Sequence, residues 1–278
     1  MNYCSYFIKD KCMFGSFPTQ ESVNELEHEG VRYFIDLTYN EKENKITSYT
    51  TKYTYINYPI KDNYVPIDLT TFTVFIAKIA KIIKNLTQEK VYIHCKGGHG
   101  RSGVVVSCLL CYIFKLTPYE SLEYTTKCHN NRNSMRDKWR KIGSPQTYLQ
   151  KKFVYKFFEP LKIYQTHKNS IYLGFSNLSN HPINFDENTI FETSEIAISN
   201  LIEKFKNISS ENIDKEKINI IFNILEKKFN QYEIIRKNLI NTGLRPLLYY
   251  SFKKDDTDEK NIFGKILMKL RNKYYEKI

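Results

Sequence analysis

The chain has 278 residues, of which 41% are hydrophobic and 15% aromatic, so it is large enough for two domains with buried cores. Its formal net charge of +12 favours an anionic partner such as a nucleotide, a phosphoinositide or nucleic acid. No apolar run approaches the roughly 18 residues that span a bilayer, so we expect no stable membrane insertion. The first six residues do not pair a charged region with an apolar stretch, so we also expect no signal peptide and a cytoplasmic location.

Strand-type and helix-type runs alternate along the first 160 residues. The runs that favour strands are 33–37, 53–58 and 91–93. The runs that favour helices are 21–29, 69–85, 102–114, 118–129 and, after Gly-Ser-Pro at 143–145, 146–158. This alternation predicts an α/β fold with a central, largely parallel sheet flanked by helices. Such folds bind their ligands at the carboxyl ends of the strands.

The segment 94–102 (His-Cys-Lys-Gly-Gly-His-Gly-Arg-Ser) lies between the last of these strands and an apolar helical run, so it forms a strand-to-helix turn. Backbone N–H groups and a helix N-terminus at such a turn wrap a phosphate. Cys95 is placed to attack phosphorus as a thiolate, a form that helix N-termini and nearby cations favour. Arg101 offers a planar fork for two phosphate oxygens. The segment therefore predicts a cysteine-dependent phosphatase.

The other residues of this loop have supporting roles. Ser102 is expected to donate a hydrogen bond to the sulfur and help it leave, and His94 to orient the loop from behind. Three glycines let the backbone turn tightly around the phosphate, namely Gly97, Gly98 and Gly100. Lys96 and His99 add basic groups that suit a polyanionic substrate, although Lys96 pointing into solvent is an equal reading.

The loop resembles the signature of the protein tyrosine/dual-specificity phosphatase superfamily. The segment 58–66 (Tyr-Pro-Ile-Lys-Asp-Asn-Tyr-Val-Pro) looks like the general-acid loop of that family. The resemblance implies that Asp62 protonates the leaving oxygen and then acts as the base toward water. Asp68 is the weaker alternative, because it precedes a helical run and reads better as an N-cap.

The segment 144–150 (Ser-Pro-Gln-Thr-Tyr-Leu-Gln) is similar to the region that carries the water-positioning glutamines of the family. Gln146 is the first candidate and Gln150 the second, while an ordinary helix start is the alternative reading. Segments 14–18 and 33–37 also look like the opening of the family, so the resemblance covers about residues 1–160. Because Cys95 comes early, the compact dual-specificity type fits better than a receptor-type tyrosine phosphatase. We expect this domain at residues 1–162.

The remaining residues carry a second resemblance. The segment 172–183 looks like the opening of the NADAR (YbiA-like) family, and Thr193-Ser194-Glu195 falls at its Ser-Glu-His element. Segments 225–229, 239–243 and 261–271 match its later blocks in order, so we expect a NADAR-like domain at residues 168–278. Composition alone predicts only a mainly helical domain.

NADAR relatives hydrolyse N-glycosidic bonds in ADP-ribose derivatives. The resemblance therefore implies an ADP-ribosyl ligand and makes Glu195 the carboxylate near the ribosyl carbon, with the pair Asp255 and Asp256 near a later acidic position. The chain departs from the family after Glu195, where Ile-Ala-Ile-Ser follows, and its single tryptophan, Trp139, lies in the other domain. The domain is thus either an active glycosidase or a fold retained for binding or for packing.

Three functional hypotheses follow for the whole chain. The leading one is a phosphatase that hydrolyses phosphomonoesters of a protein, a phosphoinositide or a nucleotide/RNA through a cysteinyl-phosphate intermediate. The alternatives are a catalytically silent protein that binds phosphate and ADP-ribose, and an N-glycosidase with an accessory phosphatase. None needs a metal or another cofactor, and we expect Cys108 and Cys111 in the core rather than as metal ligands.

Overall fold

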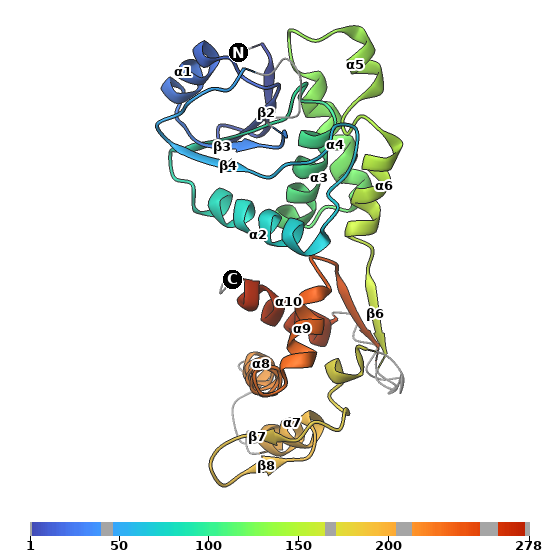
Figure 1. Ribbon diagram of the computed structural model, residues 1–278. Helices are drawn as coiled ribbons and strands as arrows, with labels where there is room; N and C mark the ends of the chain where they lie inside the picture. The colour runs from blue at the N-terminus through green and yellow to red at the C-terminus, as the bar shows by residue number, and fades with distance from the viewer. Residues whose placement is uncertain (1, 40–46, 165–170, 204–212, 251–260, 276–278) are drawn as a thin grey trace. The chain divides into compact units, whose positions relative to one another are not determined.

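The computed structural model describes residues 2–39, 47–164, 171–203, 213–250 and 261–275. The chain forms two compact units, Met1–Phe158 and Glu159–Ile278. The first holds the α/β part and the second the mainly helical part expected from the sequence (Figure 1).

The first unit is built on a five-stranded sheet with the order β1-β2-β5-β3-β4. Its strands are β1 Cys4–Ile8, β2 Cys12–Gly15, β3 Val31–Asp36, β4 Thr54–Asn57 and β5 Lys90–His94. Strands β2, β5, β3 and β4 run parallel, whereas the edge strand β1 pairs antiparallel with β2. The prediction of a central, largely parallel sheet is confirmed, and β1 and β2 are strands that the sequence analysis did not identify.

In the described part of this unit the helices that accompany the sheet are α1 Gln20–His28, α2 Leu69–Asn85, α3 Arg101–Phe114, α4 Pro118–Asn130, α5 Asp137–Ile142 and α6 Tyr148–Phe157. Helix α1 packs on β3, while α3 packs on β2 and β5 and is flanked by α2, α4 and α6 (Figure 1). Cys108 and Cys111 of α3 are buried, as expected for core residues.

The first residues of α2 and α6 show where the predicted helix boundaries agree with the structure and where they differ. Helix α2 begins where predicted, because Oδ1 of Asp68 accepts hydrogen bonds from the N–H groups of Thr70 and Thr71. The last helix of the unit was expected from residue 146 but begins at Tyr148. There Thr147 and Gln150 form a capping box, which leaves Gln146 in the preceding loop.

The described residues of the second unit form short strand pairs and four helices. Strand β6 Leu161–Tyr164 pairs parallel with β9 Leu247–Tyr250, and β7 Ile183–Asn184 pairs with β8 Ile190–Phe191. A 3-10 turn, η1 Leu173–Phe175, precedes the helices, which are α7 Ser194–Glu203, α8 Ile213–Gln231, α9 Glu233–Asn241 and α10 Ile262–Tyr275.

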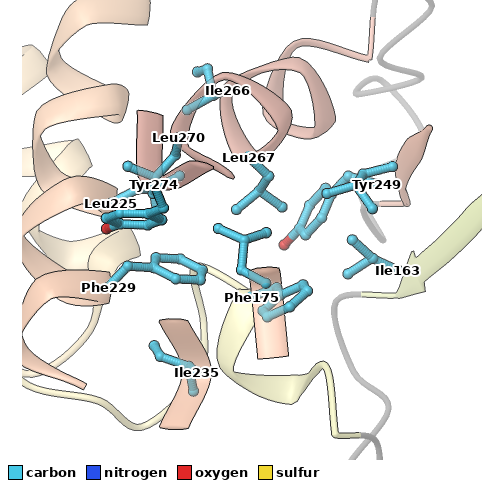
Figure 2. Packing of buried hydrophobic residues seen from close by; sticks show 12 residues of the cluster. Ile163, Phe175, Leu225, Phe229, Ile235, Tyr249, Ile266, Leu267, Leu270 and Tyr274 are labelled. Atoms are coloured by element: carbon cyan, nitrogen blue, oxygen red, sulfur yellow. The ribbon is translucent and has the colours of Figure 1, made fainter. Parts of the chain in front are cut away.

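The core of this unit joins elements that are far apart in the sequence. Figure 2 shows Phe175 of η1, Phe229 of α8 and Leu267 of α10 directed toward one another, and all three are fully buried. Burying each such side chain stabilises a fold by about 1.5–3 kcal/mol. Across the described residues of both units, no helix is both long and apolar enough to cross a membrane.

Candidate active site

The phosphate loop connects β5 to α3 at the carboxyl edge of the sheet. Strand β5 ends at His94, and α3 begins at Arg101 behind Gly100. The sulfur of Cys95 lies 3.5 Å from Oγ of Ser102, and its residue is only 3% exposed. The hydroxyl that was predicted to assist sulfur as a leaving group therefore contacts it directly.

The glycines of the loop are needed where other backbone comes close. Gly98 has a φ of 71°, and a Cβ there would lie 2.4 Å from the carbonyl carbon of Gly15. A Cβ at Gly100 would meet the side-chain amide of Gln150 at 2.8 Å. A Cβ at Gly97 would approach only the ring of His99. The loop is thus pressed against β2 on one side and α6 on the other.

Arg101 connects this loop to the segment that carries Asp62. Its Nη2 lies 3.0 Å from Oδ1 of Asp62, and its Nη1 donates a 3.1 Å hydrogen bond to the carbonyl of Ile60. The guanidinium is buried, whereas the Asp62 carboxylate is 57% exposed. The structure thus brings together the arginine and the carboxylate that the sequence analysis selected, with the carboxylate open to solvent.

Both candidate glutamines contact the same segment. Gln146 donates a 2.8 Å hydrogen bond to Oδ1 of Asn63, and Gln150 donates a 3.1 Å bond to the carbonyl of Tyr64. The Oε1 of Gln150 accepts from the backbone N–H of Thr147. Gln150 is therefore engaged at both ends as a helix cap and a tether, while Gln146 is half-buried beside the Asp62 segment.

His94 is buried behind the loop. Its Nε2 is 2.7 Å from the hydroxyl of Tyr49, and its Nδ1 is 3.7 Å from the buried carboxylate of Asp36. Burial lowers the pKa of His94 to about 4, the nearby charge of Arg101 adds to this, and Asp36 opposes it. A neutral imidazole in this position supports the predicted orienting role and adds no charge to the site.

The expected positive charge at His99 is not present. Its Nδ1 lies 2.8 Å from Nε2 of His129, and its ring stacks on Trp139 with centroids 4.5 Å apart. Burial lowers the pKa of His99 to about 3, so the side chain is neutral at pH 7. Lys96 is the basic side chain of the loop that is exposed.

Sequence reasoning missed Arg132, a buried arginine behind the loop. It follows α4 and donates a 2.8 Å hydrogen bond from Nη1 to the carbonyl of Gly98. No spacing from Cys95 marks it in a single sequence. Its signal is an arginine two residues after the end of α4, a helix that packs on α3.

In the second unit, Glu195 lies in the first turn of α7 within a polar network. Asn177 donates through its side-chain amide to Glu195, and Oδ1 of Asn177 accepts a 2.8 Å hydrogen bond from the hydroxyl of Tyr249. Nearby, the buried ammonium of Lys228 donates to the carbonyl of Ser176 at 2.7 Å. Burial lowers the pKa of Lys228 to about 7. The pair at positions 255 and 256 lies outside the described residues.

No three metal-ligating side chains converge in the parts of the two units that the structure describes. The phosphate loop and its neighbours supply a thiol, a guanidinium, a carboxyl group and amide side chains. This set belongs to cysteine-dependent phosphatases.

Comparison with known proteins agrees with this class. The family described as "PTP-SAK: Swiss Army Knife protein, DSP-PTPase phosphatase domain" matches residues 1–154, and the chain belongs to it. The chain is an enzyme, a phosphatase of the tyrosine/dual-specificity type. It is 33% identical to "Putative tyrosine phosphatase 197R" of Invertebrate iridescent virus 6, over 99% of this chain and 96% of that protein.

Other relatives cover parts of the chain. Protein 067L of Invertebrate iridescent virus 3, named in the same way, is 38% identical over 57% of this chain and 66% of its own length. Among solved structures, Tk-PTP in its active form covers 55% of this chain and 94% of its own, at 20% identity and a TM-score of 0.43. The E. coli protein YbiA covers 42% of this chain and 86% of its own, at 21% identity and a TM-score of 0.34.

Proposed function

We propose that the first unit hydrolyses phosphomonoesters in two steps through a cysteinyl-phosphate intermediate. In the first step the Cys95 thiolate attacks phosphorus while Arg101 binds two of the phosphate oxygens. Asp62 protonates the oxygen that leaves. The observation that carries the proposal is the 3.0 Å contact between Arg101 and Asp62 above a loop that also holds Cys95.

In the second step, water attacks the phosphorus of the intermediate and Cys95 leaves as a thiolate. Asp62, now ionised, accepts a proton from that water, so the carboxyl group returns to its starting form. Ser102, at 3.5 Å from the sulfur, stabilises the departing thiolate by a hydrogen bond. Gln146 is the candidate to align the water, because it contacts the residue next to Asp62.

The test of the nucleophile is Cys95→Ser, measured on a small aryl phosphate. Turnover should be abolished while the circular dichroism spectrum stays unchanged. The matched control is Cys128→Ser, which removes a buried thiol from α4 rather than from the loop and should keep its turnover. Activity that persists after Cys95→Ser would contradict the mechanism. If wild-type protein binds phosphate without turnover, the silent binding protein is the correct alternative.

We propose a phosphoprotein, a phosphoinositide, or a nucleotide or RNA phosphate as the substrate. The one exposed basic side chain of the loop, Lys96, suits any of these anions. The six cysteines are all unpaired thiols, which fits a reducing compartment such as the cytoplasm. A panel of these substrates, each compared with Cys95→Ser, ranks them by kcat/KM.

We propose for the second unit that it binds ADP-ribosyl groups or hydrolyses their N-glycosidic bonds. The supporting observation is the network of Asn177, Glu195 and Tyr249, which orients one carboxylate. Glu195→Gln keeps the size of the side chain and removes its charge. Release of ADP-ribose from ADP-ribosylated nucleic acid that is lost in this variant supports hydrolysis. Binding without release supports a recognition role. If the protein shows neither binding nor release, both proposed roles are wrong.

A further inference from the structure

Arg132 is almost fully buried on the far side of the phosphate loop. Besides its bond to Gly98, its Nη2 donates to the carbonyl of Phe14 at 3.0 Å and its Nε to Oγ of Ser5 at 3.3 Å. The guanidinium carbon lies 4.4 Å from the centroid of the Phe14 ring. One side chain thus joins the phosphate loop to both β1 and β2, and its residue is 3% exposed.

The position of Arg132 is itself supported by α5. Arg140 donates through Nη2 to the carbonyl of Arg132 at 2.5 Å and through Nη1 to that of Asn130. Burying an arginine without a carboxylate partner is costly, so contacts with several carbonyl groups are needed to offset the loss of water. The turn after α4 is therefore built to hold a cation at this place.

The bond to Gly98 acts on the loop geometry. A phosphate loop binds its ligand through N–H groups, so its carbonyl groups must find partners on the outside. Arg132 satisfies the carbonyl of Gly98 and thereby fixes the peptide between Gly98 and His99, whose N–H belongs to the loop. Gly98 has a φ of 71°, a backbone conformation that most residues do not adopt. The hydrogen bond from Arg132 helps to hold the loop in this conformation.

The charge of Arg132 lies against the loop that holds the sulfur. The carbonyl that its Nη1 binds belongs to Gly98, three residues after Cys95 in the same loop. The titratable groups around the guanidinium come from β1, β5, the loop, α4 and α5, and they are Cys4, Tyr92, His99, His129 and Arg140. Burial raises the pKa of the thiol and the phenol and lowers the pKa of both histidines, which keeps these four groups neutral at pH 7. Of these five groups only Arg140 carries charge, beside the charge of Arg132 itself.

We propose that Arg132 is a positioning residue of the phosphatase, which fixes the Gly98 peptide from behind and favours the thiolate form of Cys95. The inference rests on the proposed role of Cys95 as the nucleophile. It adds a buried cation to Arg101 and Lys96, placed on the side of the loop to which the carbonyl of Gly98 points.

The test uses Arg132→Met, which removes charge and hydrogen bonds, and Arg132→Lys, which keeps the charge but loses the fork. The rate at which iodoacetamide alkylates Cys95 is measured against pH by mass spectrometry of the peptide, because only the thiolate reacts. For Arg132→Met we expect the midpoint of this profile to rise by about one pH unit. At pH values below the midpoint, alkylation should then be about tenfold slower than in the wild type. Arg132→Lys should keep the midpoint but lose kcat/KM for the aryl phosphate.

Arg136→Met is the matched control, because Arg136 is an exposed arginine in the same connection between α4 and α5. It should keep both the alkylation profile and kcat/KM. An unchanged midpoint in Arg132→Met, with only a lower Tm, would make Arg132 a structural residue and overturn the proposal. If Arg132→Met does not fold, a full kcat/KM in Arg132→Lys overturns it too. Alkylation needs no turnover, so this outcome is separate from a failure of the Cys95→Ser test.

Discussion

The side-chain amide of Gln146 donates a 2.8 Å hydrogen bond to Oδ1 of Asn63, the residue that follows Asp62. Asn63 has a φ of 63°, a left-handed conformation that asparagine tolerates better than most residues. The glutamine that the sequence suggests for aligning water therefore also holds the turn that carries the proposed general acid. Water alignment and tethering of the turn are two effects that one substitution would remove together.

Gln146→Ala and Asn63→Gly each break this bond, and glycine keeps the left-handed backbone available. We expect each variant to lower kcat about fivefold to tenfold, the equivalent of one hydrogen bond. The double variant should fall no further if Gln146 acts through Asn63. Stopped-flow kinetics separates the roles, because loss of water alignment slows the second step and produces a burst of the first product. Fully additive effects would contradict the tether.

Asp62→Asn should lower kcat by about 10²–10⁴-fold on an alkyl phosphate, because the poor leaving group then lacks its proton. The loss should be smaller on an aryl phosphate with a good leaving group, and KM should not rise, since the variant frees Arg101 from an ion pair. Asp68→Ala is the control. It removes the N-cap of α2 and should cost about 1 kcal/mol of unfolding free energy with kcat unchanged. Equal losses in both variants would move the acid role away from Asp62.

Short sequence patterns predicted the helices, strands and turns whose formation depends on residues that are close in the sequence. Helix α2 and its cap at Asp68 follow from a helical run behind an aspartate, and β5 and the phosphate loop follow from an apolar strand before a glycine-rich turn. Strands β1 and β2 are short. Strand β1 pairs with β2, and β2 is fixed in the sheet by pairing with β5, which lies 75 or more residues away in the chain. Such long-range pairing leaves little periodic signal.

The residues of the site also fall into those that local sequence reveals and those that depend on distant partners. Cys95, Arg101 and Ser102 lie in one segment, so their spacing alone reveals them. The neutral state of His99 depends on His129 and Trp139, and the role of Arg132 depends on Gly98, partners that only the folded chain brings close. The sequence of the loop suggests His99 as a basic group, but burial decides its charge.

Gly98→Ala should inactivate the enzyme. The substitution forces a Cβ onto a φ of 71° and within 2.4 Å of the Gly15 backbone, so we expect a loss of at least about 2 kcal/mol in stability and little turnover. Gly97→Ala is the matched comparison, because Gly97 has no positive φ and its Cβ would meet the side chain of His99 rather than backbone. It should keep most of the stability. Thermal unfolding and kcat/KM measure both effects, and equal losses would show that φ is not the reason.

Burial of His94 should make the first unit sensitive to acid. The pKa of His94 is lowered to about 4, against about 6.5 in the unfolded chain, so between these values the unfolded state binds the proton. The contribution is fully present above pH 6.5 and is lost as the pH falls toward 4, amounting to about 2 kcal/mol between pH 7 and pH 5. Urea unfolding followed by the fluorescence of Trp139 reports on this unit.

His94→Gln should remove that part of the pH dependence, while His28→Gln, which changes an exposed histidine, should leave it as it is. His99 and His129 act in the same direction, because burial lowers their pKa values to about 3 and about 4. Some acid sensitivity therefore persists in His94→Gln. A pH dependence identical to that of the wild type would contradict the buried neutral imidazole.

Lys228 should make the stability of the second unit rise with pH. Burial lowers the pKa of Lys228 to about 7, whereas an unfolded lysine has a pKa of about 10.4, so the unfolded state binds more protons between these values. Stability should increase by about 2 kcal/mol from pH 7 to pH 9. Pulse proteolysis in urea, with fragments of α8 identified by mass spectrometry, measures this increase. Lys228→Met should abolish it, and Lys227→Met, on the exposed neighbour, should keep it. A slope that survives Lys228→Met would assign the pH dependence to another group and leave Lys228 as an ordinary charged clamp on the carbonyl of Ser176.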